Sequence, residues 1–524
     1  MSYCEVSIVS MDLAIYITAP NVKSAMIAPH SAVSRSHLNI VNLFLEEVVK
    51  GSTSLEFFHR EDCVEFEDFD VNLDNVLIRE SERKVAIASN PDVVPVIRSQ
   101  IGSKKKNSLR SNILTFEARN FNADRGVDIS CDEYVSDILV ENFFSKLIDE
   151  SKLAQVLVDR IGVSVPRLGD WIDSRDGGRF KGLVNDLSVP MDVEDNLINF
   201  RLMVKSDAKP KLDDSVISKV SSGQNIVYHK KKINAVFSNV FLQVVEALRF
   251  CLVPNVILYT GMNTDDFASE VQSRIGPDID NYFCGELDIS KYDKSQGPLF
   301  KQIEEKILRR FGVEASVLDK WYASEYESCV ATQDRTFQAD IGAQRRSGAS
   351  NTWLGNTLIN MCLQAACTNF EELSCIAFAG DDSLILSRLP VPNVYSEIQD
   401  MYGFDVKFIQ HAAPYFCSKY LVNNGANLVF VPDPYKVLVK LGRTVSDKEK
   451  LCHEVFISFC DSVKYLNNET VVSKLVYYHS IKYGPAAFAY GAFASIHCIS
   501  ANFAQFKRLF YSRSGHGFCL SLND

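Results

Sequence analysis

The apolar and polar positions of this 524-residue chain divide it into three parts with different patterns. Residues 1 to about 195 alternate short apolar runs with polar turns and carry no motif that indicates a chemistry. Residues from about 196 to 445 hold several motifs. From 446 to 524, apolar residues recur at intervals of three and four, a spacing typical of helices. We therefore expect a mixed fold whose last part is helical.

Two motifs of the middle part lie on predicted strands. The apolar residues between 282 and 289 predict a short strand with Asp288 near its middle, and Asp293 follows just past its end. Apolar runs on both sides of Gly380-Asp381-Asp382 predict two strands joined by a tight turn. Adjacent carboxylates at such a turn repel each other, and a divalent cation would offset that cost. The alternatives are an Asx-capped turn for the first motif and a solvated Asp-Asp turn for the second.

A third motif runs from Ser347 to Asn356, between the other two. Ser347-Gly348 suits a flexible loop, and the apolar residues that follow predict a helix to about residue 366. Thr352 and Asn356 are four residues apart and share a face of that helix. A site that distinguishes ribose from deoxyribose needs hydrogen-bonding groups at the 2′-hydroxyl, and Asp293 with Asn356 suits that task. An ordinary loop and capped helix is the alternative.

Phosphoryl transfer connects the three motifs. Two metal ions, ~3.5–4 Å apart, can activate the attacking hydroxyl and stabilise the leaving pyrophosphate. Magnesium takes oxygen ligands, and Asp288 and Asp381 would supply them from two adjacent strands. Each motif alone is common, but the three in this order and spacing predict nucleotide polymerisation.

The composition adds limits to this interpretation. With 46% hydrophobic residues the chain can build a large core or two to three subdomains. The net charge of −11 argues against a surface that is basic throughout, yet residues 201–235 carry eight Lys or Arg against three Asp. That excess fits a local basic channel, with a solvated basic face as the alternative. The fourteen cysteines show neither C-x-x-C pairs nor zinc spacing, so we expect core thiols in a reducing compartment.

Two segments bear on membranes and secretion. The first 30 residues lack the basic start and apolar run of a secretory signal. Residues 483–506 contain no charged residue, but their Ala, Ser and Gly give too little transfer energy for a membrane span. We expect a buried helix there, with contact at a membrane surface as the alternative.

The motifs resemble the palm motifs of viral RNA-dependent RNA polymerases. ELDISKYDKSQ (286–296) looks like motif A, SGASNTWLGNT (347–357) like motif B, and AGDDSL (379–384) like motif C. The resemblance is closest to the alphavirus-like supergroup of positive-strand RNA viruses, especially plant members such as tobamoviruses and closteroviruses. Chain size and the absence of a G-x-x-x-x-G-K-[ST] loop favour the closteroviruses.

Further segments extend the resemblance over about residues 200 to 445. The basic finger segments resemble residues 205–211 and 228–235, and the residues before motif B resemble 344–346. Motif D is similar to 404–407, motif E to 415–420, and the segment after motif E to 432–442.

The resemblance implies an α+β right-hand fold of fingers, palm and thumb, in which the palm is a small antiparallel sheet with helices on one face. We expect residues 1–195 to be an N-terminal extension that contributes to the fingers, 196–445 to form fingers and palm, and 446–524 to form a helical thumb. An independent domain that recruits another replication protein is the alternative for residues 1–195.

The resemblance also implies roles for single residues. Asp288, Asp381 and Asp382 would bind Mg²⁺, or Mn²⁺ in its place. Asp293, Thr352 and Asn356 would sense the ribose beside Ser347 and Gly348, and Lys407 would donate a proton to the pyrophosphate. Contacts to the triphosphate or to RNA phosphates would come from Arg345, Lys205, Lys209, Lys211, Lys231 and Lys232. A solvated surface position is the alternative for Lys407 and for each of these basic residues.

The implied activity is replication and transcription of a positive-strand viral RNA genome. The partners would be the RNA template, the nascent RNA, NTPs and a viral methyltransferase-helicase replication protein, in membrane-associated complexes of the host cytoplasm.

Two other functions remain as alternatives. A reverse transcriptase shares the two-metal palm, but typically blocks the 2′-hydroxyl with a bulky side chain where this chain pairs Asn356 with Asp293. A non-enzymatic RNA-packaging or scaffold protein would leave the motifs without a task.

Overall fold

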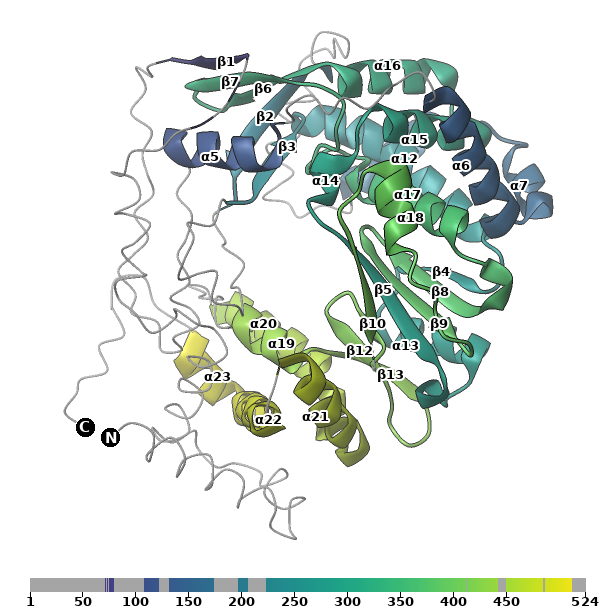
Figure 1. Ribbon diagram of the computed structural model, residues 1–524. Coiled ribbons are helices and arrows are strands. Elements are labelled where there is room, and N and C mark those ends of the chain that lie inside the picture. Colours follow the sequence, from purple (N-terminus) through teal and green to yellow (C-terminus); the bar gives the residue numbers. More distant parts are fainter. Residues whose placement is uncertain are drawn as a thin grey trace.

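The computed structural model describes residues 71, 73, 75–79, 108–121, 132–173, 197–205, 223–411, 413–441, 449–483 and 486–510. The predicted phosphate-binding residues Lys209 and Lys211 lie outside these ranges. The described residues form three sheets with helices around them (Figure 1).

A five-stranded central sheet carries both acidic motifs. Its strands are β4 (Val256–Leu258), β5 (Phe283–Ile289), β8 (Leu373–Ala379), β9 (Asp382–Ser387) and β10 (Val406–His411), in the order β10-β5-β9-β8-β4. β8 and β9 form the predicted hairpin, and β9–β5 and β5–β10 are antiparallel too. The expected antiparallel arrangement thus holds for the strands that carry the motifs, whereas β4 runs parallel to β8.

Side chains of the central sheet alternate between two cores, as the pleat of a strand requires. Ile376 and Phe378 of β8 join the core around helix α17 (Thr352–Cys367). Cys375 and Ala377 join a core shared with helix α13 (Thr264–Ile275) and a three-stranded sheet. We expected helices on one face only, but α13 covers part of the second face.

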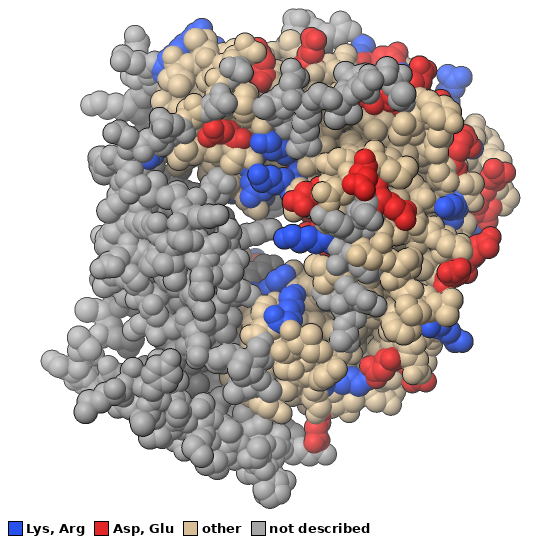
Figure 2. Space-filling view, viewed as in Figure 1, with Lys and Arg blue, Asp and Glu red and all other residues tan. Residues whose placement is uncertain are grey.

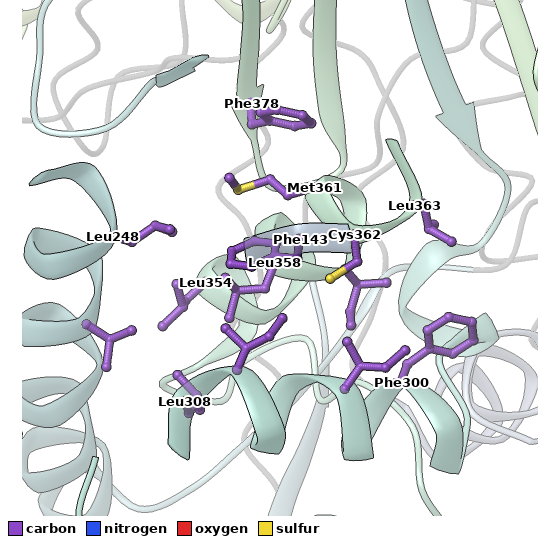
Figure 3. Close-up of a cluster of buried hydrophobic side chains, with 14 of the residues drawn as sticks. Phe143, Leu248, Phe300, Leu308, Leu354, Leu358, Met361, Cys362, Leu363 and Phe378 are labelled. Carbon is purple, nitrogen blue, oxygen red and sulfur yellow. The ribbon is translucent and has the colours of Figure 1, made fainter. Parts of the chain in front are cut away.

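Helix α17, which follows the third motif, is surrounded by other elements. Its apolar residues meet α6 (Asp132–Leu147), α12 (Lys231–Cys251) and α15 (Pro298–Arg310). Figure 3 shows this cluster: Leu354, Leu358, Met361, Cys362 and Leu363 of α17 with Phe143, Leu248, Phe300, Leu308 and Phe378. A helix that is apolar on most sides must be buried, so α17 is a rigid support for the polar residues of its first turns.

A second five-stranded sheet joins the N-terminal part to the middle part (Figure 1, top). Its order is β1-β7-β6-β2-β3, for strands Val76–Ile78, Phe337–Ile341, Ser328–Thr332, Asn199–Val204 and Asn225–Tyr228. Helix α5 (Leu109–Arg119) packs on this sheet, and α6 packs on α15 and α17. Helices α7 (Glu150–Val156) and α8 (Val165–Asp173) pack on α12, and α16 (Ala315–Tyr326) packs on α15. The described elements before residue 195 therefore pack on elements of the middle part.

The last part is helical, as its apolar spacing predicts. The three-stranded sheet (β11 Tyr415–Phe416, β12 Lys419–Asn423, β13 Leu428–Pro432) leads to α19 (Pro434–Leu441), α20 (Glu449–Ser462), α21 (Glu469–Tyr483), α22 (Ala486–Ser500) and α23 (Phe503–Phe510). These elements share a core that includes Val429, Leu475 and Phe493. Ala492 and Phe493 are buried on α22, so the uncharged segment 483–506 contains the expected buried helix.

Shorter elements connect the larger ones: α14 (Tyr292–Ser295), α18 (Tyr395–Tyr402) and three 3₁₀ turns at Ile279–Asn281, Phe370–Glu372 and Lys464–Asn467. Among the described helices, α12 alone is long and apolar enough to cross a membrane, and half of its most apolar window is buried inside the protein. Val240, Val244 and Leu248 of α12 are fully buried in the main core, as in a core helix of a folded domain.

Candidate active site

The Gly-Asp-Asp motif forms the tight turn between β8 and β9. Ala379 pairs with Asp382, which leaves Gly380 and Asp381 as the two turn residues. Gly380 has a φ of +66°, and Asp381 is not among the residues with positive φ, so this is a type II′ turn with glycine in its first central position. The Asp381 side chain is exposed at the tip, whereas Gly380 is buried.

Helix α17 holds this turn in place through side chains on one of its faces. Nδ2 of Asn360 lies 3.3 Å from the carbonyl oxygen of Gly380 and 3.1 Å from that of Asp381, and donates to them. The hydroxyl of Thr357 accepts from the amide of Gly380 at 2.9 Å. These bonds satisfy backbone groups of the turn, so they fix the position of the Asp381 backbone, and with it that of the adjacent Asp382, relative to α17.

Asp288, the next-to-last residue of β5, lies between two other predicted site residues. It is paired with Lys407 of β10 in the antiparallel register. On the other side, the register of β5 with β9, continued toward the hairpin tip, sets Asp288 across from Asp382. Residues directly opposite in a sheet point to the same face, so two acidic groups and one lysine share this row.

The electrostatics of the hairpin tip disfavour an ionised Asp382. Burial, reinforced by the negative charges of Asp381 and Glu286, raises the pKa of Asp382 to about 6. The thiol of Cys417 donates a hydrogen bond to Asp382 and counteracts part of this rise in pKa. Glu286 stands two residues before Asp288 and therefore lies on the same face of β5. Several carboxylates thus meet at one corner of the sheet, where a cation would relieve their repulsion.

These carboxylates fit an open magnesium site. In the described part of the chain, no three His, Cys, Asp or Glu side chains come close enough to enclose a metal ion by themselves. Mg²⁺ does not need such an enclosure, because it usually keeps several waters and binds through one or two carboxylates plus substrate phosphates. The side chains of Asp288 and Asp381 are exposed, as this kind of binding requires.

The predicted ribose-sensing residues are in direct contact. Nδ2 of Asn356 donates to Oδ1 of Asp293 at 2.9 Å. Asp293 lies in the short helix α14, just past β5, and Asn356 lies one turn into α17. The neighbouring Tyr292 donates its hydroxyl to the backbone oxygen of Asn356 at 3.1 Å, which ties α14 to α17.

The segment before α17 is a loop, as we expected, and it is hydrogen-bonded to β3. The hydroxyl of Ser347 donates to the carbonyl of Asn225 at 3.1 Å, and the amide of Gly348 donates to the carbonyl of Val227 at 2.9 Å. A Cβ at Gly348 would lie 2.5 Å from Cγ2 of Ile226, so glycine is required for this approach. The hydroxyl of Thr352 donates to the carbonyl oxygen of Arg346 at 2.6 Å. The lone pairs of the Thr352 hydroxyl oxygen can therefore still accept a hydrogen bond.

Comparison with known proteins identifies the family. A model of the family described as RNA dependent RNA polymerase matches residues 66–509 of this chain. The chain belongs to the RNA-dependent RNA polymerase family. The match extends well beyond residues 200–445, over which the motifs alone carried the resemblance.

Plant-virus relatives of this polymerase support the predicted grouping. It is 40% identical over 482 residues to replicase polyprotein 1ab of Grapevine leafroll-associated virus 3, covering 92% of this chain and 17% of the polyprotein. It is 35% identical over 480 residues to replicase polyprotein 1ab of Beet yellows virus, covering 91% of this chain and 16% of the polyprotein. RNA-directed RNA polymerase 2a of Cucumber mosaic virus is 28% identical over 491 residues, 92% of this chain and 55% of that protein. The resemblance to the alphavirus-like plant virus polymerases is therefore confirmed, although the chain spans only a part of each relative.

The predicted basic residues of the polymerase fall into two groups. Lys205 and Lys231 are exposed, and Figure 2 shows Lys and Arg side chains on both sides of the central hollow. Lys232 is only 7% exposed and Arg345 only 1%. The guanidinium of Arg345 donates hydrogen bonds to Asn356 and Gln296, so its position favours support of the predicted ribose-sensing pair over contact with phosphate.

Some residues near the site were not singled out from sequence. Gln296 closes the motif A segment and bonds to Asn356, and Cys417 bonds to Asp382. Glu304 and Lys301 are fully buried charges on α15. Both residues lie among buried apolar residues of α15. A charged residue on an otherwise apolar helix face is a sequence signal that could have revealed them.

Proposed function

We propose that the polymerase copies an RNA template into RNA from NTPs and so replicates and transcribes a positive-strand viral genome. The observation that carries this proposal is the meeting of Asp288, Asp381 and Asp382 at one corner of the central sheet. They come from two neighbouring strands and the turn between β8 and β9, and α17 holds that turn. A solvated Asp-Asp turn would need neither the second strand nor the bonds from α17.

The acidic residues would act through bound metal. Two Mg²⁺ ions, or Mn²⁺ in their place, would activate the attacking hydroxyl and stabilise the leaving pyrophosphate. Asp288 and Asp381 would be the main ligands because their carboxylates are exposed, and Asp382, which is partly buried, would support them. Lys407, exposed and opposite Asp288, would donate a proton to the pyrophosphate.

Sugar selection would depend on Asp293 and Asn356. The Asp293 carboxylate can accept a hydrogen bond from a ribose 2′-hydroxyl, and the Asn356 amide holds that carboxylate in place. The hydroxyl oxygen of Thr352, one turn before Asn356, can accept a further bond. A dNTP would leave these groups without their partner, which is the basis of strong discrimination.

The right-hand arrangement is part of the same proposal. The central sheet with α13 and α17 would be the palm, and the sheet from β1 to β3 with its helices would be the fingers. Helices α20 to α23 would be the thumb. The pairing of β1 with β7 and the packing of α5 on β2 and β3 support a contribution of the N-terminal residues to the fingers.

The partners of the polymerase would be the RNA template, the nascent RNA and NTPs. We further propose a viral methyltransferase-helicase replication protein as a partner, in membrane-associated complexes of the host cytoplasm. The names of the two replicase polyproteins support a place in a larger viral replication system, since this chain is similar to a sixth or so of each.

Primer extension on an RNA template with Mg²⁺ and labelled NTPs tests the proposal. Asp381→Asn should abolish incorporation, because it removes a charged ligand at equal size. Asp400→Asn on α18, also at an exposed aspartate, is the matched control and should leave activity unchanged. Near-normal activity of Asp381→Asn, or its collapse in melting temperature together with activity, would count against the catalytic assignment.

A further inference from the structure

The side-chain amide of Asn356 is held on both sides. Its Nδ2 donates to Oδ1 of Asp293 at 2.9 Å. Its Oδ1 accepts from Nε2 of Gln296 at 2.8 Å and from Nε of Arg345 at 3.1 Å. These distances are those of ordinary hydrogen bonds. The nitrogen side of the amide therefore faces Asp293, and the oxygen side faces the interior.

Arg345 determines this direction, because a guanidinium donates hydrogen bonds but cannot accept them. Its Nε and Nη2 donate to Oε1 of Gln296 at 3.0 and 2.6 Å. Gln296 must then present its nitrogen to Asn356, and Asn356 must present its oxygen to both neighbours. The two amides form a chain with a fixed direction that ends on the carboxylate of Asp293.

The guanidinium is held where it is by buried charges. Its Nη2 lies 2.7 Å from Oε2 of Glu304, and both side chains have 0% of their surface exposed. Glu304 also accepts from Nδ2 of Asn351 at 2.8 Å. Beside it, Lys301 is paired with the buried Glu325. Removing one partner of a buried ion pair is costly, so Arg345 cannot turn toward a phosphate without breaking this network.

Backbone geometry also ties Arg345 to both ribose-sensing residues. A Cβ on Gly355 would lie 2.2 Å from Nη1 of Arg345, so the guanidinium needs a glycine immediately before Asn356. The backbone amide of Arg345 donates to the carbonyl oxygen of Asp293 at 3.1 Å. Arg345 is thus in contact with α17 through its side chain and with α14 through its backbone.

We propose that Arg345 and Gln296 are positioning residues for sugar selection: they fix the orientation of the Asn356 amide and, through it, the carboxylate of Asp293 that reads the 2′-hydroxyl. This inference rests on the proposed function of Asp293 and Asn356. Without the fixed direction, the Asn356 amide can turn its oxygen toward Asp293. The carboxylate then loses its donor and is repelled, so it no longer stands where a ribose hydroxyl would meet it.

Single-nucleotide incorporation by the full chain tests the inference, with each NTP and its matching dNTP measured for kpol and apparent Kd. Gln296→Glu keeps the shape of the side chain, but its carboxylate cannot donate to Asn356. Arg345→Lys keeps the charge and loses the planar fork. We expect each variant to lower the NTP:dNTP preference by about tenfold, the factor that corresponds to one hydrogen bond of a charged group.

Arg346 provides a matched control, because it is the same residue type in the next position and is also fully buried. Its guanidinium donates to Oγ of Ser328 and to backbone carbonyls, including those of Gln344 and Gly342. None of its bonds to described residues goes to Asn356. Arg346→Lys should therefore lower the melting temperature about as much as Arg345→Lys and leave the NTP:dNTP preference unchanged.

Asn356→Ala separates the inference from the function on which it rests. If this variant keeps the wild-type preference, the ribose is read elsewhere and the proposed role of the pair is wrong. If it lowers the preference while Gln296→Glu and Arg345→Lys do not, the positioning role alone is overturned. An equal loss of NTP:dNTP preference in Arg346→Lys would also overturn the positioning role, because a general loss of packing in the interior would then explain the lower preference. Should Arg345→Lys not fold, Gln296→Glu decides, because it leaves the pair of Arg345 with Glu304 intact.

Discussion

Lys407 of β10 lies directly opposite Asp288 of β5, although 119 positions separate the two residues in the chain. The pair places a lysine beside a predicted metal-binding carboxylate on one face of the central sheet. Lys407 is exposed, so it can reach a substrate group at that face. The register therefore places the predicted proton donor next to a predicted metal ligand.

Lys407→Met should lower the rate of incorporation, kpol, by about 100-fold, the lower end of what a general acid contributes. The apparent Kd for NTP should change little, because the proton is needed only as the pyrophosphate leaves. Rapid-quench kinetics of a single incorporation measures both quantities. Lys407→Arg keeps the charge beside Asp288 and is the control. If kpol recovers at high Mg²⁺ in Lys407→Met, the lysine only adjusts metal affinity and is not the acid.

Asp382→Asn should stabilise the metal-free polymerase at pH 8, with a melting temperature higher by a few °C. The pKa of Asp382 is raised from 3.8 to about 6, so above pH 6 the folded protein carries an unfavourable charge that asparagine removes. As the pH falls through 6 toward 4, the wild-type carboxyl is protonated in the fold and the difference between the two proteins should vanish. Melting curves at pH 8 and pH 5 test this, and an equal difference at both values would contradict it. Added Mg²⁺ should stabilise the wild type more than the variant.

Charge reversal at Lys231 and at Lys232 should have different consequences. Lys231 is exposed at the start of α12, so Lys231→Glu should weaken RNA binding and flatten the slope of log affinity against log salt by about one unit. Lys232 is 7% exposed, so Lys232→Glu buries an acidic group and should lower the melting temperature. Fluorescence anisotropy with labelled RNA across a salt series, with melting curves, separates the two effects. A wild-type slope for Lys231→Glu would make this lysine a solvated surface charge.

A fragment of residues 196–524 should aggregate or lose activity. It lacks α6, whose Leu139, Phe143 and Leu147 are almost fully buried against the middle part. Their removal uncovers apolar surface of α15 and α17, and α17 carries residues of the site. A fragment of residues 132–524 retains α6 and should be more soluble, as gel filtration would show. A soluble and active 196–524 fragment would refute a contribution of the N-terminal residues to the fingers and would favour a recruiting domain.

The local elements of the site could be predicted from sequence because their signals are local. Alternating apolar residues around Gly380 and a glycine in the turn suffice for the hairpin. The spacing of Thr352 and Asn356 places both on one helix face, and Asp293 and Asn356, which the motifs assign to one task, are hydrogen-bonded to each other. The family, too, could be identified from the order of three short motifs, because together they describe one chemistry.

Burial and long-range pairing, by contrast, were decided by the tertiary structure. Arg345 and Lys232 look like Lys205 and Lys231 in a basic sequence, yet the first two are buried and the last two are exposed. The position of Lys407 opposite Asp288 depends on how β10 adds to the edge of the sheet. Whether a charge faces solvent or a buried counter-charge depends on what packs over it, and residues distant in the chain provide that packing. The sequence alone therefore predicted the chemistry, whereas the tertiary structure decided which charged residues are exposed near the acidic motifs and which are buried in the interior.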